Sequence, residues 1–182
     1  LVKIANDLRW LASGPRCGIG ELKLPGLQPG SSIMPGKVNP VIPEAVIQMA
    51  YQVMGNDTAI MLAGQAGNFE LNVTLPLLAH NLLQSIDLLA LAARQLKNRC
   101  LDGLEVDLTA TSGYIENSLA LVTGFVPHLG YDEAAQLAKN AYESGRTVRA
   151  VAKESDLLDE ATINTVLGPP PGAAGGKGAD PR

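Results

Sequence analysis

Apolar residues recur at helical spacing along most of the chain, and they predict helices with almost no strands. A first helix is expected from Leu1 to about Ala12, and Ser13-Gly14-Pro15 ends it. A second helix is expected from Pro43-Glu44 to about Gly64 or Gly67, because proline and an acidic residue both suit a first helical turn. The longest apolar pattern follows, over about 69–96.

This longest pattern carries one wide apolar stripe. A helix of about 28 residues spans roughly 42 Å, which is more than a small globular domain needs, and Pro76 is expected to bend it near its start. Long helices rich in Ala and Leu with broad apolar faces are typical of bundles shared between subunits. Polar side chains interrupt the run, so we expect no membrane crossing. They are Asn68, Glu70, Asn72, His80, Asn81, Gln84 and Asp87.

The helical pattern becomes shorter after Gly103, which predicts two domains. Residues 1–103 are expected to form part of a long-helix bundle, and 104–167 a small helical domain, so the fold class is all-α. The expected short helices cover about 108–116, 118–125, 132–144, 148–154 and 160–167. Asp132, Thr147 and Asp159 are well placed as N-caps. The tail over 168–182, rich in Gly, Pro and Ala, is expected to be disordered.

Composition and charge narrow the function only a little. The 182 residues are 46% apolar and 4% aromatic, which is enough for a core of Leu, Ala, Val and Ile. The net charge of −4 predicts no nucleic-acid partner. Cys17 and Cys100 lie far apart and fit no metal-ligand spacing, so no metal site is expected and a reduced cytosolic setting is the simpler interpretation.

The segment richest in chemistry is the loop Gly30–Pro40, which reads GSSIMPGKVNP. Its glycines let the backbone approach a ligand closely, and consecutive amide groups in such a turn form an anion site. Lys37 offers a point charge for a carboxylate or phosphate, and Asn39 can orient it. Ser31 and Ser32 are candidate proton carriers or hydrogen-bond donors. The competing interpretation is an ordinary turn.

The loop resembles the signature loop of the fumarase/aspartase superfamily. The similarity continues over nearly the whole chain except the tail. The other matching segments are Ile4–Gly18, Gly55–Asp57, Gly67–Val73, His80–Ser85 and 128–167.

The resemblance implies a lyase without a cofactor. Family members add or remove a small group across the double bond of fumarate, by anti elimination through a carbanion held as an aci-carboxylate. Ser31 matches the catalytic base, and Ser32, Lys37, Val38 and Asn39 match substrate-binding positions. Glu44 matches a glutamate that positions a histidine, although a first-turn helix acid would explain it as well.

The resemblance also implies a homotetramer in which three subunits build each active site. The family's histidine and most anchors for the second carboxylate lie in a region that would precede Leu1. We therefore expect this chain to be the C-terminal part of such a subunit, inactive alone. The expected partner is a small dicarboxylate, with no membrane partner. The expected location is the cytoplasm, or the mitochondrial matrix in a eukaryote.

Three functional hypotheses remain open from the sequence. Class II fumarase, which hydrates fumarate to (S)-malate, is favoured by the stretch around Trp10 and by 67–72. Aspartate ammonia-lyase is the second, and a fragment that only assembles is the third. Outside the loop, His80 and His128 are expected to be structural, and Arg16 to help hold the loop.

Overall fold

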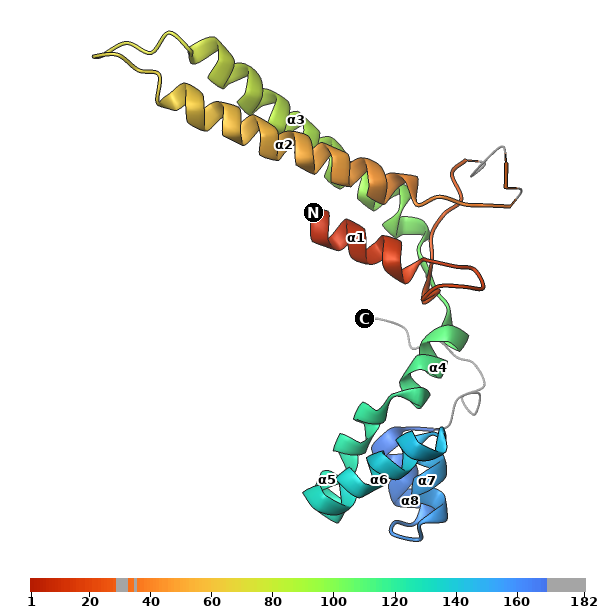
Figure 1. The fold of residues 1–182 in the computed structure, drawn as a ribbon. Helices are drawn as coiled ribbons and strands as arrows, with labels where there is room; N and C mark the ends of the chain where they lie inside the picture. The colour runs from red at the N-terminus through yellow and green to blue at the C-terminus, as the bar shows by residue number, and fades with distance from the viewer. Residues whose placement is uncertain (29–32, 35, 170–182) are drawn as a thin grey trace. The chain divides into compact units, whose positions relative to one another are not determined.

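The computed structural model describes residues 1–28, 33–34 and 36–169, and it is mostly helical, which confirms the all-α class. The chain forms two compact units (Figure 1), one over Leu1–Asp107 and a second that begins at Leu108. The first unit contains the described part of the signature loop. The expected disordered tail falls largely on 170–182, which lie outside the described residues.

The first unit is a long helical hairpin with a third helix packed near one end (Figure 1). The hairpin consists of α2 (Val41–Gly64) and α3 (Leu75–Arg99), and the third helix is α1 (Val2–Leu11). Their shared core lies where α1 packs against the start of α2 and the end of α3, at the end of the hairpin next to the signature loop. Its buried members are Ala5, Leu8, Val46, Ile47, Ala92, Leu96 and Cys100. This core fixes the start of α2 against α1.

The start of α3 differs from the prediction, which placed it near Phe69. The helix begins at Leu75, because two polar side chains cap the end of α2 instead of continuing a helix. Asn72 Nδ2 and Thr74 Oγ1 donate to the Ala63 carbonyl at 3.0 and 2.8 Å. Such side-chain to backbone bonds compete with helix formation.

The expected bend at Pro76 is therefore wrong. Pro76 lies in the first turn of α3, where its missing N–H removes no helical hydrogen bond.

By length and composition alone, 75–103 would suffice to cross a membrane. However, Asn81 and Ser85 on α3 are buried against α2.

Asn56 is the polar centre of the hairpin. It is 3% exposed on α2, and its Nδ2 donates to Gln84 Oε1 at 2.9 Å and to Ser85 Oγ at 3.1 Å on α3. Gln52 Nε2 donates to Asn56 Oδ1 at 2.8 Å. Because buried polar groups are costly to leave unpaired, this network aligns the two helices.

Asn56→Ala is expected to lower the free energy of unfolding by about 1–3 kcal/mol, because partners on both helices lose a buried hydrogen bond. Urea denaturation measures the change. The control is Thr58→Ala, on the exposed face of α2, where the hydroxyl donates only to the Met54 carbonyl of its own helix. An equal loss in both variants would contradict the role of Asn56.

A short antiparallel pair of strands closes the first unit, a feature absent from the predicted elements. Strand β1 (Leu22–Lys23) follows α1, and β2 (Glu105–Val106) follows α3 and a 3₁₀ turn, η1 (Leu101–Gly103). The Asp107 amide also donates to the Glu21 carbonyl at 2.8 Å. The first unit therefore extends beyond Gly103, where we expected its boundary.

The second unit follows the predicted helices closely. It contains α4 (Leu108–Asn117), the 3₁₀ helix η2 (Leu119–Phe125), α5 (Val126–Leu129), α6 (Tyr131–Ser144), α7 (Val148–Glu154) and α8 (Glu160–Leu167). Its core surrounds Phe125, Val148 and Ile163, each at most 1% exposed.

Two of the three predicted caps in this unit are confirmed. Thr147 Oγ1 accepts from the Ala150 amide at 3.2 Å, and Asp159 Oδ1 accepts from the Thr162 amide at 2.7 Å. The hydrogen bonds from Thr162 lower the pKa of Asp159. The third cap, Asp132, is wrong, because α6 begins at Tyr131 and puts Asp132 inside its first turn.

Buried Arg149 ties α4, α7 and α8 together. Its Nε and Nη2 donate to the two oxygens of Glu116 at 2.9 and 3.3 Å, and Nη1 donates to Asn164 Oδ1 at 3.1 Å. Because it is paired with Glu116 and hydrogen-bonded at all three of its nitrogens, the charge is tolerated inside the unit.

Candidate active site

The signature loop leads directly into α2. The structure describes 33–34 and 36–40 of it, whereas the predicted catalytic Ser31 and the predicted substrate-binding Ser32 lie outside the described residues. The Lys37 amide donates to the Met34 carbonyl at 3.2 Å, which closes a turn. Gly36 in this turn has φ of +79°, a conformation that favours glycine.

The last loop residues set the entry into α2. The Val41 amide donates to the Asn39 carbonyl at 2.9 Å, and the Glu44 amide donates to the Pro40 carbonyl at 3.1 Å. Asn39 therefore lies one residue before Pro40, the N-cap at the positive end of a long helix, and Lys37 lies two residues earlier. A helix N-terminus with an adjacent cation favours an anionic ligand.

Lys37, Val38 and Asn39 line a common cavity of about 460 Å³, a size typical of small-molecule sites. Its other walls come from Ala12–Pro15, Gly20, 22–24, Gly26, Gly36, Pro40 and Asp107. The three described residues that were predicted to bind substrate therefore all line this one cavity.

Two lysines, Lys23 and Lys37, line this cavity, and they differ in whether an acidic side chain pairs with them. Lys23 Nζ lies 2.7 Å from Asp107 Oδ2, and the hydrogen bond to this carboxylate raises the pKa of Lys23. Within the described part of the chain, Lys37 has no ion-pair partner. Lys37 is therefore the cation in the cavity that can serve a bound anion.

The wall formed by the segment after α1 is held by Ser13. Its Oγ donates to the Trp10 carbonyl at 2.6 Å and accepts from the Ile19 amide at 3.0 Å. A Cβ at Gly18 would lie 2.4 Å from the Ser13 carbonyl oxygen, so a side chain there would clash with the backbone. Arg16, which was expected to hold this loop, is exposed and forms no hydrogen bond or ion pair to another described residue.

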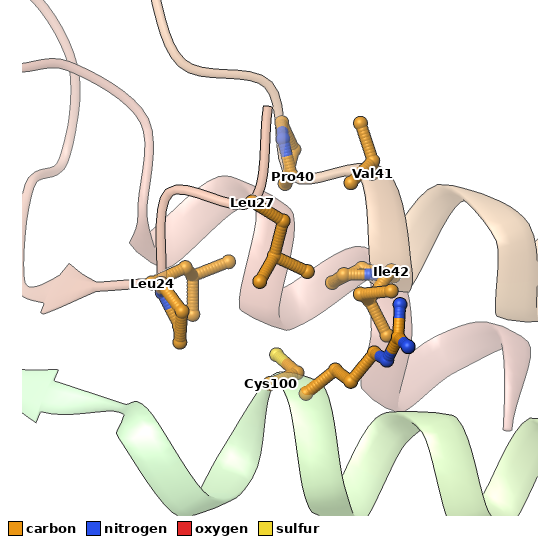
Figure 2. Close-up of a pocket in the computed structure, with 9 residues that line it drawn as sticks. Leu24, Leu27, Pro40, Val41, Ile42 and Cys100 are labelled. Carbon is orange, nitrogen blue, oxygen red and sulfur yellow. The ribbon is translucent and has the colours of Figure 1, made fainter. Parts of the chain in front are cut away.

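An apolar crevice anchors the other side of the loop, beside the start of α2 and the end of α3. Figure 2 shows its labelled side chains, which are Leu24, Leu27, Pro40, Val41, Ile42 and Cys100. The crevice is only about 10 Å³, too small for a dicarboxylate. Burial raises the pKa of the Cys100 thiol, which fits a packing role rather than a reactive one.

Glu44 lies in the first turn of α2 and contacts α1. Arg9 Nη2 lies 3.5 Å from Glu44 Oε1, and Arg9 Nη1 donates to Asn6 Oδ1 at 3.1 Å. The predictions did not include Arg9, because its partner on α2 is 35 residues away. The only sequence signal was its position within the family-like segment 4–18.

His80, the histidine of the first unit, lines neither this cavity nor the crevice. His80 is exposed on α3. Over residues 1–28, 33–34 and 36–169, no three His, Cys, Asp or Glu side chains are placed together to hold a metal ion.

Two family models match the sequence. Residues 1–55 match a model described as lyase, and residues 121–170 match one described as fumarase C C-terminus. The first match covers α1, the signature loop and the start of α2, and the second covers most of the second unit.

Individual proteins with similar sequences include a fumarate hydratase and an aspartate ammonia-lyase. A class II fumarate hydratase from Thermosynechococcus vestitus is 56% identical over 158 residues, which cover 87% of this chain and 34% of that protein. An aspartate ammonia-lyase from Pseudomonas aeruginosa is 50% identical over 169 residues, covering 93% of this chain and 36% of that protein.

The fold matches solved structures as well. A crystal structure of a fumarate lyase:delta crystallin from Brucella melitensis has a TM-score of 0.86 at 49% identity, covering 91% of this chain and 36% of that one. The chain thus spans about a third of the length of the relatives that it matches.

Proposed function

Because the chain belongs to the fumarase/aspartase superfamily and spans about a third of its relatives' length, we propose that it supplies the signature-loop part of an active site that reversibly hydrates fumarate to (S)-malate. The observation that carries this proposal is the cavity that Lys37, Val38 and Asn39 line together. A dicarboxylate fits the size of this cavity, and among the described residues that line it Lys37 is the cation without an ion-pair partner.

In the direction of elimination, the Ser31 alkoxide takes the proton from the carbon next to a carboxylate of malate. The electron pair left on that carbon spreads into the carboxylate and forms an aci-carboxylate. Lys37 and Asn39 hold this group, so they bind more strongly as charge develops there. The carbon–oxygen bond on the neighbouring carbon then breaks as an acid that another segment supplies gives a proton to the leaving hydroxyl, which departs as water.

Ser31 needs help to act as a base, because a free hydroxyl is a weak one. The positive charge of Lys37 and the amide groups of the loop are the groups we assign to stabilise its alkoxide. Glu44 is assigned to the opposite side of the site, where it orients a histidine that another segment supplies.

We also propose that the active enzyme is a homotetramer with shared sites. Large apolar side chains remain exposed on the hairpin, as expected of helices that pack against other subunits. Among them are Tyr51, Met54, Met61, Leu62, Leu77, Leu82, Leu83, Ile86 and Leu89. A cytoplasmic location fits two cysteines that both remain free.

Aspartate ammonia-lyase is the second candidate, supported by the relative from Pseudomonas aeruginosa. The signature loop handles the carboxylate and the carbon-bound proton, and both reactions need these steps. Non-catalytic assembly is the third candidate, because the chain spans only about a third of its relatives.

The test is an assay of the gene product that carries this sequence, at its full natural length. Malate and aspartate are supplied separately, and the absorbance of the fumarate double bond is followed. Turnover of malate alone supports the hydratase, and turnover of aspartate alone supports the ammonia-lyase. A tetramer in light scattering that turns over neither substrate supports assembly without catalysis. The 182-residue chain by itself is expected to show no significant turnover.

A further inference from the structure

We propose that Arg9 is a positioning residue for Glu44, an inference that rests on the hydratase function proposed above. Arg9 projects from α1, and Glu44 lies in the first turn of α2. Their contact joins the helix before the signature loop to the helix after it. The orientation of the Glu44 carboxylate therefore depends on a residue outside the loop.

The guanidinium is held at two points. Arg9 Nη1 donates to Asn6 Oδ1 at 3.1 Å, one turn earlier on the same helix, and Nη2 lies 3.5 Å from Glu44 Oε1. A planar guanidinium fixed at one nitrogen leaves its other nitrogens little freedom. The contact with Asn6 thus directs Nη2 toward Glu44.

Neither hydrogen bonding within α1 nor a gain in stability explains the position of the Arg9 side chain. Arg9 Nε is buried and has no hydrogen-bond partner among the described residues, which is an unfavourable state for a charged group. The side chains of Arg9 and Glu44 are 40% and 38% exposed, so the pair contributes little to stability. The position of the Arg9 guanidinium is better explained by its effect on the orientation of the Glu44 carboxylate.

Glu44 keeps one oxygen available. Among the described residues, Arg9 is the only side chain that contacts its carboxylate, and it does so at Oε1. Oε2 remains for a further donor, such as the histidine assigned above. The other cation of α1, Lys3, is already paired with Asp7 and does not compete.

The test is a double-mutant cycle in the gene product at its full natural length. Arg9→Met is expected to lower kcat by about 10- to 100-fold, because a small displacement of a catalytic group has effects of that size. The KM for malate should change little, since Arg9 does not touch substrate. If Arg9 acts through Glu44, Arg9→Met combined with Glu44→Gln is no slower than Glu44→Gln alone.

Two further variants complete the design. Arg9→Lys keeps the charge but lacks the fork that reaches both Asn6 and Glu44, so an intermediate kcat is expected. Lys3→Met removes a positive charge from the same helix without touching Glu44, and it should keep the unsubstituted kcat. Thermal unfolding and light scattering report folding and assembly for each variant. If Arg9→Met does not fold, Arg9→Lys decides by the same criterion.

An unchanged kcat in the folded Arg9 variant overturns the inference, as does a rise in KM alone. Additive losses in the double variant overturn it as well, because the two residues then act separately. In each of these cases the unsubstituted protein still turns over malate, and the proposed function stands. If the unsubstituted protein turns over neither malate nor aspartate, the function and the inference fail together.

Discussion

Ser31→Ala is expected to lower kcat for malate by about 10²- to 10⁴-fold, the range typical of losing a positioned base. Alanine has no hydroxyl, so nothing at this position can take the carbon-bound proton. The KM should change far less, because the substitution leaves in place Lys37 and Asn39, the residues proposed to bind the carboxylate. Ser31 lies outside the described residues, and its role stays a prediction from the signature loop. The measurement is steady-state kinetics of the protein at full natural length.

The control for this experiment is Ser144→Ala in the second unit. The Ser144 hydroxyl donates to the Asn140 carbonyl of its own helix at 2.6 Å, so its loss should leave turnover unchanged. Light scattering verifies that both variants assemble like the unsubstituted protein. If Ser31→Ala keeps most of its rate, the assignment of the base is wrong, and the proton must go to another group.

Lys37→Met is expected to lower kcat for malate by about 10²- to 10³-fold, comparable to the loss of an oxyanion donor. In the proposed mechanism the negative charge on the bound carboxylate grows as the proton leaves, so Lys37 is expected to bind the transition state more strongly than the substrate. The KM should also rise, because the proposal places the same ammonium against the ground-state carboxylate. Methionine retains similar length and apolar contact while it removes the charge.

Lys23→Met is the matched control for charge in the same cavity. Asp107 Oδ2 lies 2.7 Å from Lys23 Nζ and already neutralises it, so its loss should affect kcat far less than the loss of Lys37. Equal losses of kcat in the two variants would indicate that turnover depends on the overall positive charge of the cavity, rather than on a direct contact between Lys37 and the carboxylate. An unchanged kcat in Lys37→Met would remove Lys37 from the mechanism.

Several helix boundaries were correct from the sequence because local interactions decide them. Helices α7 and α8 begin where predicted, since Thr147 and Asp159 cap them through amides three residues later. Helix α3 begins later than predicted, because Asn72 and Thr74 bind the end of α2. Whether those side chains face the Ala63 carbonyl depends on where α2 ends, and periodicity in the following segment carries no such information.

In the candidate site, too, some features follow from the local sequence and others depend on tertiary packing. That Lys37 and Asn39 bind an anion stays a prediction from side-chain chemistry and loop composition, and the structure adds that both residues line one cavity. The cavity itself was not predictable, because part of its wall comes from Ala12–Pro15, Gly20 and 22–24. Within this wall, the pairing of β1 with β2 holds Leu22 and Lys23 in place.

The sequence by itself determined the helical class and most of the short helices of the second unit, whereas the chemistry of the signature loop stays a prediction from it. These follow from residue type and from neighbours within about one helical turn. Only the tertiary structure decided that Lys23 is neutralised by Asp107 while Lys37 is not, and that Arg9 meets Glu44. Those pairings join residues far apart in the chain, and packing of the helices and strands, not local pattern, brings them together.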